Sequence, residues 1–214
     1  MQLKEIIKNT NLRNILSNFI SLSFLQIANF ILPLLTIPYL VRTLGMENYG
    51  MLAFATSIIM YFQVVSEYGF NLTATREVSV YRDNKEKIEE IYSAVTSSKV
   101  LLGIISFIML TISMFFIERF AEEYLIIYLT FGIVIGQIFF PIWFFQGIEK
   151  MQFITFLNVL SKIVFTVLIF LLIKKPEHMI YVPVFQSLGY LIAGVISVLL
   201  VLKRFDIQFK IPSF

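Results

Sequence analysis

Long apolar runs, separated by short charged or turn-rich breaks, follow one another along the whole chain. A bilayer core of about 30 Å takes roughly 20 helical residues at about 1.5 Å each, so runs of this length predict membrane-spanning helices. The pattern therefore predicts an all-α, polytopic membrane protein with six crossings. The predicted spans are 19–41, 51–70, 93–117, 124–145, 153–173 and 180–202.

The composition excludes a water-soluble globule. Hydrophobic residues make up 58% of the chain and charged residues 14%, whereas soluble domains carry about 25% charged residues. The net charge of +3 is too small to indicate a nucleic-acid partner. With no cysteine and one histidine, His178, the chain lacks the ligands of a thiolate or two-histidine metal site and a second histidine for a charge relay. We predict no metal, no cofactor, no catalytic residue and no enzymatic activity.

The basic residues predict an orientation. Outside the spans, 11 Lys and Arg residues fall on the side that holds both termini and 4 fall on the other side. Because cytoplasmic loops are enriched in Lys and Arg, both ends are predicted to be cytoplasmic. Segment 71–92 is then a cytoplasmic linker, whose run 85–91 is typical of a short amphipathic surface helix with a Lys85–Glu89 pair. We interpret the charges of this run as surface solvation.

Three ionisable side chains fall inside the predicted spans: Glu67, Lys99 and Lys162. A charge at that depth costs roughly 2.5–3.5 kcal/mol on insertion scales, so such residues are candidates for function. Lys162 lies near the middle of its span. Glu67 and Lys99 lie nearer the cytoplasmic ends, where snorkelling to the headgroups is the alternative. For Lys162 the alternative is a structural ion pair, with Glu67 as the partner.

Polar side chains fall on one face in four of the spans, at about 100° per residue. A polar face is unfavourable against lipid, so spans one, two, three and five are predicted to line a common polar cavity. These faces comprise Asn18, Gln26, Asn29, Pro33 and Thr36; Thr56, Gln63 and Glu67; Thr96, Lys99, Gly103, Ser106 and Ser113; and Thr155, Asn158, Lys162 and Thr166.

Spans four and six differ, because their small residues recur at four-residue spacing. Gly132 and Gly136 in the fourth, and Gly189, Ala193 and Ser197 in the sixth, allow close helix approach. These two spans are predicted to pack against other helices rather than to contact a substrate.

Prolines interrupt two of the spans. Pro33 and Pro38 in the first and Pro141 in the fourth remove backbone hydrogen bonds and should bend or break these helices. Such bends are found in moving transport segments, and a static kink is the alternative.

Four segments, in order, resemble the Wzx-type polysaccharide (O-antigen) flippases of the multidrug/oligosaccharidyl-lipid/polysaccharide exporter superfamily. They are LTIPYLVRTLG at 35–45 with NYG at 48–50, YGFN at 68–71, TREVS at 75–79 and WFFQGIEKM at 143–151. The resemblance covers nearly the whole chain. It implies transfer of a polyprenyl-pyrophosphate-linked oligosaccharide from the cytoplasmic to the outer leaflet of the inner membrane. The implied mechanism is alternating access between two helical lobes around a cationic cavity.

Members of that family have twelve or more transmembrane helices, and this chain resembles the first six. We therefore expect an N-terminal lobe whose second lobe is missing from the chain; a homodimer mate is the alternative. The other implied partners are the lipid-linked oligosaccharide, membrane lipid and the glycan polymerase machinery.

Roles for individual residues follow from membrane energetics together with the resemblance. Pyrophosphate needs cations and sugars need hydrogen-bonding side chains. Arg42, Arg76 and Glu149 lie within the resembling segments, whereas Lys162 does not. The predicted phosphate ligands are Lys162, Lys99 and Arg42, the predicted sugar ligands are Gln26, Asn29, Gln63 and Asn158, and the predicted coupling or gate residues are Glu67 and Arg76. Glu67 would carry a coupling proton or pair with Lys99.

Two rival functions stay open. In a drug/cation exporter of the same superfamily, acidic residues should dominate the cavity; two intramembrane lysines against one glutamate disfavour it. In a non-transporting membrane scaffold, the polar faces would be helix-packing contacts.

Overall fold

The computed structural model describes residues 10–210, with side chains from residue 15 onward. Six helical stretches in this range are long and apolar enough to cross a membrane, which confirms the predicted class and number of crossings. The elements are α2 (Thr10–Leu44), α3 (Met46–Glu67), α4 (Phe70–Val80), α5 (Lys85–Phe116), α6 (Glu118–Glu122), α7 (Tyr124–Ile138), α8 (Ile142–Gly147), α9 (Met151–Leu172), η1 (Pro176–Ile180) and α10 (Tyr181–Arg204).

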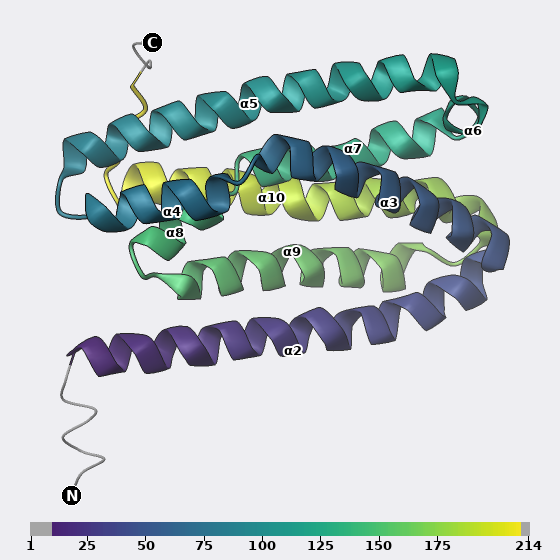
Figure 1. The fold of residues 1–214 in the computed structure, drawn as a ribbon. Helices are drawn as coiled ribbons and strands as arrows, with labels where there is room; N and C mark the ends of the chain where they lie inside the picture. The colour runs from purple at the N-terminus through teal and green to yellow at the C-terminus, as the bar shows by residue number, and fades with distance from the viewer. Residues whose placement is uncertain (1–9, 211–214) are drawn as a thin grey trace, which may run out of the picture.

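The long helices form an elongated bundle (Figure 1). Helix α10 packs against both α7 and α9, and α2 packs along α9. The described chain enters and leaves at one end of the bundle, on the left of Figure 1, which we call the terminal end; the other end is the distal end. The orientation prediction also counted Lys4 and Lys8, which lie outside the described residues.

The second and third crossings are longer than predicted. After an interruption at Tyr68–Gly69, the second helix continues as α4, so much of the segment predicted as a linker is helical. The charged run 85–91 is not a separate surface helix. It forms the first turns of α5, where the Asn84 side chain caps the helix by accepting a hydrogen bond from the Lys87 N–H at 3.1 Å.

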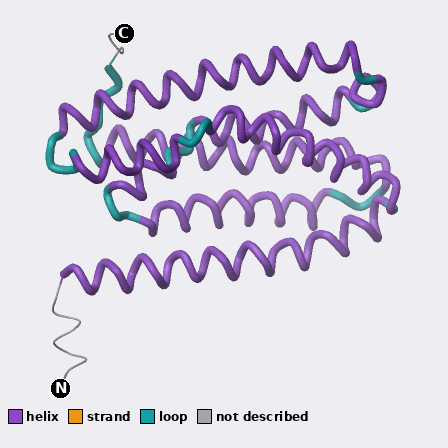
Figure 2. Tube along the Cα trace, in the orientation of Figure 1, coloured by secondary structure: helices purple, strands orange, loops and turns teal. Residues whose placement is uncertain are grey.

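Proline has different effects in the two helices. Helix α7 ends at Ile138 and α8 begins at Ile142, so the break expected at Pro141 is confirmed. Helix α2, in contrast, is continuous through Pro33 and Pro38, and Figure 2 shows it as one curved helix. A proline deletes one helical hydrogen bond, and the remaining bonds carry α2 past that gap.

Close contact between α7, α9 and α10 confirms the predicted packing of small residues. A Cβ atom added at Gly136 would lie 2.5 Å from the carbonyl carbon of Tyr190, and one at Gly189 would lie 2.6 Å from the carbonyl oxygen of Ser161. A Cβ at Gly194 would lie 2.7 Å from the carbonyl oxygen of Gly136. The absence of side chains therefore lets the three backbones touch.

Buried apolar side chains form two clusters, one toward each end of the bundle. The distal core contains most of the buried apolar residues of α3 and α7, among them Ile59 and Ile127. The terminal core contains those of α4 and α8, among them Val78 and Phe144. The two helix interruptions therefore coincide with the boundary between the cores.

The residues after α10 fold back onto the start of α5. Ile207 is buried in the terminal core, and the Gln208 N–H donates to the Glu89 carboxylate at 3.2 Å. Lys210 pairs with the same carboxylate at 2.9 Å, and this hydrogen bond raises the pKa of Lys210 above its usual 10.5. The expected Lys85–Glu89 pair is present at 4.0 Å. The interpretation of this run as surface solvation was nevertheless wrong for Glu89, because this buried carboxylate anchors the segment that follows α10.

Candidate functional site

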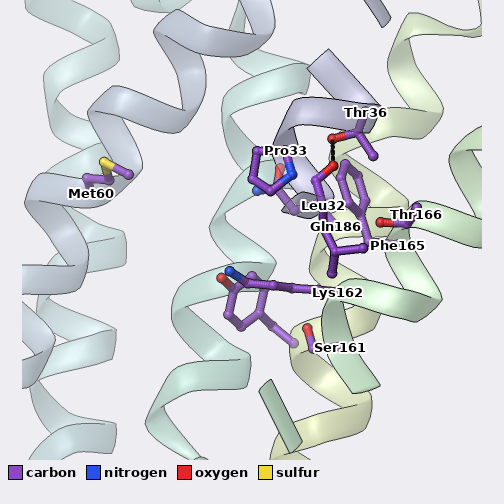
Figure 3. A pocket seen from close by; sticks show the side chains of 10 residues that line it. Leu32, Pro33, Thr36, Met60, Ser161, Lys162, Phe165, Thr166 and Gln186 are labelled. Atoms are coloured by element: carbon purple, nitrogen blue, oxygen red, sulfur yellow. Dashed lines mark hydrogen bonds between the residues drawn. The ribbon is translucent and has the colours of Figure 1, made fainter. Parts of the chain in front are cut away.

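A polar pocket of about 310 Å³ lies at membrane depth between α2, α3, α9 and α10. Figure 3 shows Lys162 extending from α9 into it, with Pro33 on α2 and Met60 on α3 contributing other walls. A second hollow of about 320 Å³ adjoins it and shares Pro33, Thr36, Phe165 and Gln186. Together they form one polar region on the α2–α3–α9–α10 side of the bundle.

Lys162 is the one charged residue among the ten that line this pocket. Its ammonium group donates a hydrogen bond to the side-chain oxygen of Asn29 on α2. The alternative ion pair with Glu67 is wrong, because Glu67 pairs with Lys99. The charge of Lys162 thus has a neutral partner within the described part of the chain and keeps its capacity to attract an anion.

Neutral hydrogen-bonding groups surround this cation. Within the described residues, the Thr166 hydroxyl is buried and has no hydrogen-bond partner. Gln186 contributes an amide to both hollows. The Thr166 hydroxyl is enclosed in this arrangement, so a hydroxyl-rich ligand would be held here by the Gln186 amide and the Lys162 ammonium group.

The helices that line the pocket differ from the predicted set. Spans one, two and five contribute, as expected, through α2, α3 and α9, but the sixth span contributes Gln186 and Tyr190 from α10. The polar face of the third span, on α5, does not line this pocket. Gln186 was detectable in the sequence, since it is the one amide side chain in an apolar span that otherwise carries small residues at packing positions.

Lys99 lies away from the pocket in a buried ion pair. Its side chain is 1% exposed, and its ammonium group lies 2.9 Å from the Glu67 carboxylate and 3.2 Å from the backbone oxygen of Gln137. Of the two alternatives for Glu67, pairing with Lys99 is the one observed. Snorkelling of Lys99 to the headgroups is wrong, because the side chain turns into the bundle.

The other predicted site residues, ligands and the gate residue Arg76 alike, are dispersed. Gln26, Arg42 and Arg76 are exposed, on α2 and α4, and Gln63 is half-buried on α3. None of them lines either hollow. Asn158 donates to the Ile154 carbonyl of its own helix at 3.0 Å. The structure therefore brings together Lys162 with Asn29 and Lys99 with Glu67, but not the full predicted set.

A seam of polar contacts holds α2 against α9 and so fixes the pocket wall. The Thr155 hydroxyl donates to the Ser21 carbonyl at 2.9 Å, and the Tyr39 hydroxyl donates to the Ile173 carbonyl at 2.6 Å. The Lys162–Asn29 hydrogen bond lies between these two contacts in the chain order of both helices. Lys162 therefore belongs both to the seam and to the pocket.

Residues 15–214 match the model of the family described as polysaccharide biosynthesis protein. The chain belongs to this family. A protein of Escherichia coli (strain K12) named "Putative O-antigen transporter" is 37% identical over 196 residues, which cover 92% of this chain and 47% of that protein. One of Shigella dysenteriae with the same name is 28% identical over 187 residues, or 87% of this chain and 47% of that protein.

The chain thus spans about half the length of these relatives. No solved structure matches it. The family match includes α2, α3, α9 and α10 almost entirely, so the pocket lies within the matched region.

Proposed function

We propose that this chain is one lobe of a flippase that moves a polyprenyl-pyrophosphate-linked oligosaccharide from the cytoplasmic to the outer leaflet of the inner membrane. Membership of the polysaccharide biosynthesis family and the names of its relatives support a transporter of this type. The observation that carries the proposal is the pocket: one lysine ammonium, no carboxylate and several neutral hydrogen-bonding groups.

This chemistry favours an anionic, hydroxyl-rich headgroup. Lys162 would attract the pyrophosphate, while Gln186 would hydrogen-bond to the sugars. The polyprenyl tail can remain in lipid. A drug/cation exporter would need an uncompensated acid in the cavity, and the intramembrane Glu67 is already paired with Lys99.

The proposed mechanism is alternating access, with the pocket closed by a second lobe or by a homodimer mate. The α3 face beside the pocket exposes large apolar side chains: Met60 is 58% exposed, Tyr61 77% and Val64 72%. Apolar surface next to a polar pocket is suited to contact with a second helical lobe. A single lobe leaves the pocket open on one side and should not transport alone.

The test is Lys162→Met in the transporter that contains this lobe, with export of the lipid-linked glycan as the readout. We expect export to be lost while the expression level stays the same and the free energy of unfolding changes by no more than about 1 kcal/mol. The loss of the hydrogen bond to the neutral Asn29 amide is offset because a charge is no longer buried. Lys162→Arg should keep part of the activity, because the charge is retained but the geometry differs.

Lys175→Met is the matched control, because it removes an exposed lysine just after the same helix. It should export normally. Normal export by Lys162→Met at normal protein levels would refute the proposed role of the pocket. Loss of export together with a large loss of stability would instead show that Lys162 has a structural role, in which it holds α2 to α9.

A further inference from the structure

The second crossing is interrupted by two residues in the left-handed region. Tyr68 has φ 41° and Gly69 has φ 78°, between the end of α3 at Glu67 and the start of α4 at Phe70. Glycine adopts such a φ without strain, whereas a tyrosine rarely does. The chain therefore changes direction immediately after the carboxylate of Glu67.

The fourth crossing is interrupted at the same boundary between the two cores. In a continuous helix the Gln137 carbonyl would accept a hydrogen bond from residue 141, and that residue is a proline without an N–H. The Phe140 N–H donates to this carbonyl at 3.1 Å, and Lys99 donates to it at 3.2 Å. Lys99 thus supplies a donor where Pro141 has removed one.

Lys99 joins the two interruptions directly. One ammonium group contacts Glu67, the last residue of α3, and Gln137, the penultimate residue of α7. Glu67 in turn accepts a hydrogen bond at 2.6 Å from Asn71, in the first turn of α4. With 1% of its side chain exposed, Lys99 is not accessible to a substrate in this arrangement.

Beyond the interruptions, α4 and α8 pack as a pair. The Thr75 hydroxyl lies 3.3 Å from both the Trp143 carbonyl oxygen and the side-chain oxygen of Gln146. A Cβ atom at Gly147 would lie 2.5 Å from a methyl group of Val78, so the two short helices are in close contact. Each is connected to its longer helix through one of the two interruptions.

We propose that Lys99 is a positioning residue that sets the angle of the α4–α8 pair against α3 and α7. It acts through the Glu67 carboxylate on one side and through the Gln137 carbonyl on the other. This differs from the substrate-ligand role expected from the sequence, and it does not depend on the identity of any substrate.

The tryptophan content of the chain makes this proposal testable. Trp143 is the single tryptophan, and it lies on α8 just after Pro141. It is buried, and the centroid of its ring lies 5.9 Å from that of Tyr92. Its fluorescence therefore reports the position of α8. In lipid nanodiscs, Lys99→Met should shift the Trp143 emission to the red and increase its quenching by acrylamide in the folded protein.

Three variants distinguish a positioning role of Lys99 from a role in neutralising the charge of Glu67. Glu67→Gln should leave the Trp143 emission unchanged, because the new amide oxygen can still accept a hydrogen bond from Lys99 and Lys99 still reaches the Gln137 carbonyl. Lys99→Arg should also preserve it, since a guanidinium group can donate to both partners. The double variant Lys99→Met with Glu67→Gln removes the unpaired charge and should regain stability, yet its emission should remain shifted.

Lys162→Met is the matched control, because it removes the other intramembrane lysine and leaves both interruptions intact. Its Trp143 emission should equal that of the unmodified chain. The proposal is overturned if Lys99→Met and the double variant keep the original emission, if the double variant regains it, or if Lys162→Met shifts it equally. If Lys99→Met fails to fold, the double variant decides the outcome.

Discussion

The contact between α7 and α10 predicts that one methyl group at Gly136 destabilises the bundle. In Gly136→Ala the new Cβ would lie 2.5 Å from the Tyr190 carbonyl carbon and 2.7 Å from its oxygen. This is roughly 1 Å inside ordinary carbon–carbon contact, and the atoms in the way are backbone. The two helices must therefore separate, which also stretches the 2.6 Å hydrogen bond from Ser187 on α10 to the Leu129 carbonyl on α7.

Overpacking of this kind costs about 1–3 kcal/mol. Alanine also raises helix propensity by up to about 1 kcal/mol, so the comparison needs a variant that shares this gain. Gly50→Ala is suitable, because Gly50 lies in α3 and nothing lies within 4 Å of its added Cβ. The difference between the two variants isolates the steric cost.

The assay is thermal unfolding of both variants in the same detergent, followed by far-ultraviolet circular dichroism. At about 2–4 °C per kcal/mol for a chain of this size, Gly136→Ala should melt at least about 2 °C below Gly50→Ala. Because Tyr190 also lines the polar pocket, the same substitution should reduce export in the transporter. Equal melting temperatures for the two variants would refute the close packing of α7 on α10.

Two further predictions concern the ends of the bundle. The chain has no native cysteine, so single cysteines can be labelled cleanly. Asp83→Cys at the terminal end should be shielded from an impermeant thiol reagent in intact cells, whereas Glu177→Cys at the distal end should react. The reverse pattern would overturn the predicted orientation. The hydrogen bond to Glu89 raises the pKa of Lys210, so the stability that Lys210 contributes is present at neutral pH and is lost as the pH rises from 10.5 through the raised pKa. A spin label at Gln208 should become more mobile over that range, and unchanged mobility would show that the pair does not anchor this segment.

Hydrophobic periodicity and helix-breaking residues determined the architecture without reference to tertiary contacts. Burial in lipid requires a long apolar helix for each crossing, so run length alone predicted the six spans. Gly136 and Gly189 predicted close helix contact, because backbones can touch only where side chains are absent. Pro141 predicted a break for a similarly local reason, the loss of a backbone donor.

The lengths of the second and third crossings were harder to predict from the sequence. Segment 71–92 carries enough charge to be predicted as a linker, yet much of it is helical in α4 and α5. Ala74 and Val78 on α4 are buried in the terminal core, as are Ile88 and Tyr92 on α5. Burial of one face stabilises a helix whose other face is charged, and mean hydropathy does not record this difference.

The partners of the intramembrane charges were decided by the tertiary structure alone. The sequence placed Glu67, Lys99 and Lys162 on polar faces, which predicts that each avoids lipid. It left open which neighbour each one meets, with Glu67–Lys99 and Glu67–Lys162 as alternative pairs. The rotation of α5 against α3 and α7 brings Lys99 to Glu67 and to a carbonyl that Pro141 had left short of a donor, while the packing of α2 on α9 leaves Lys162 with an amide. The physical reason is that periodicity specifies the face of a helix, whereas contact depends on how several helices pack together.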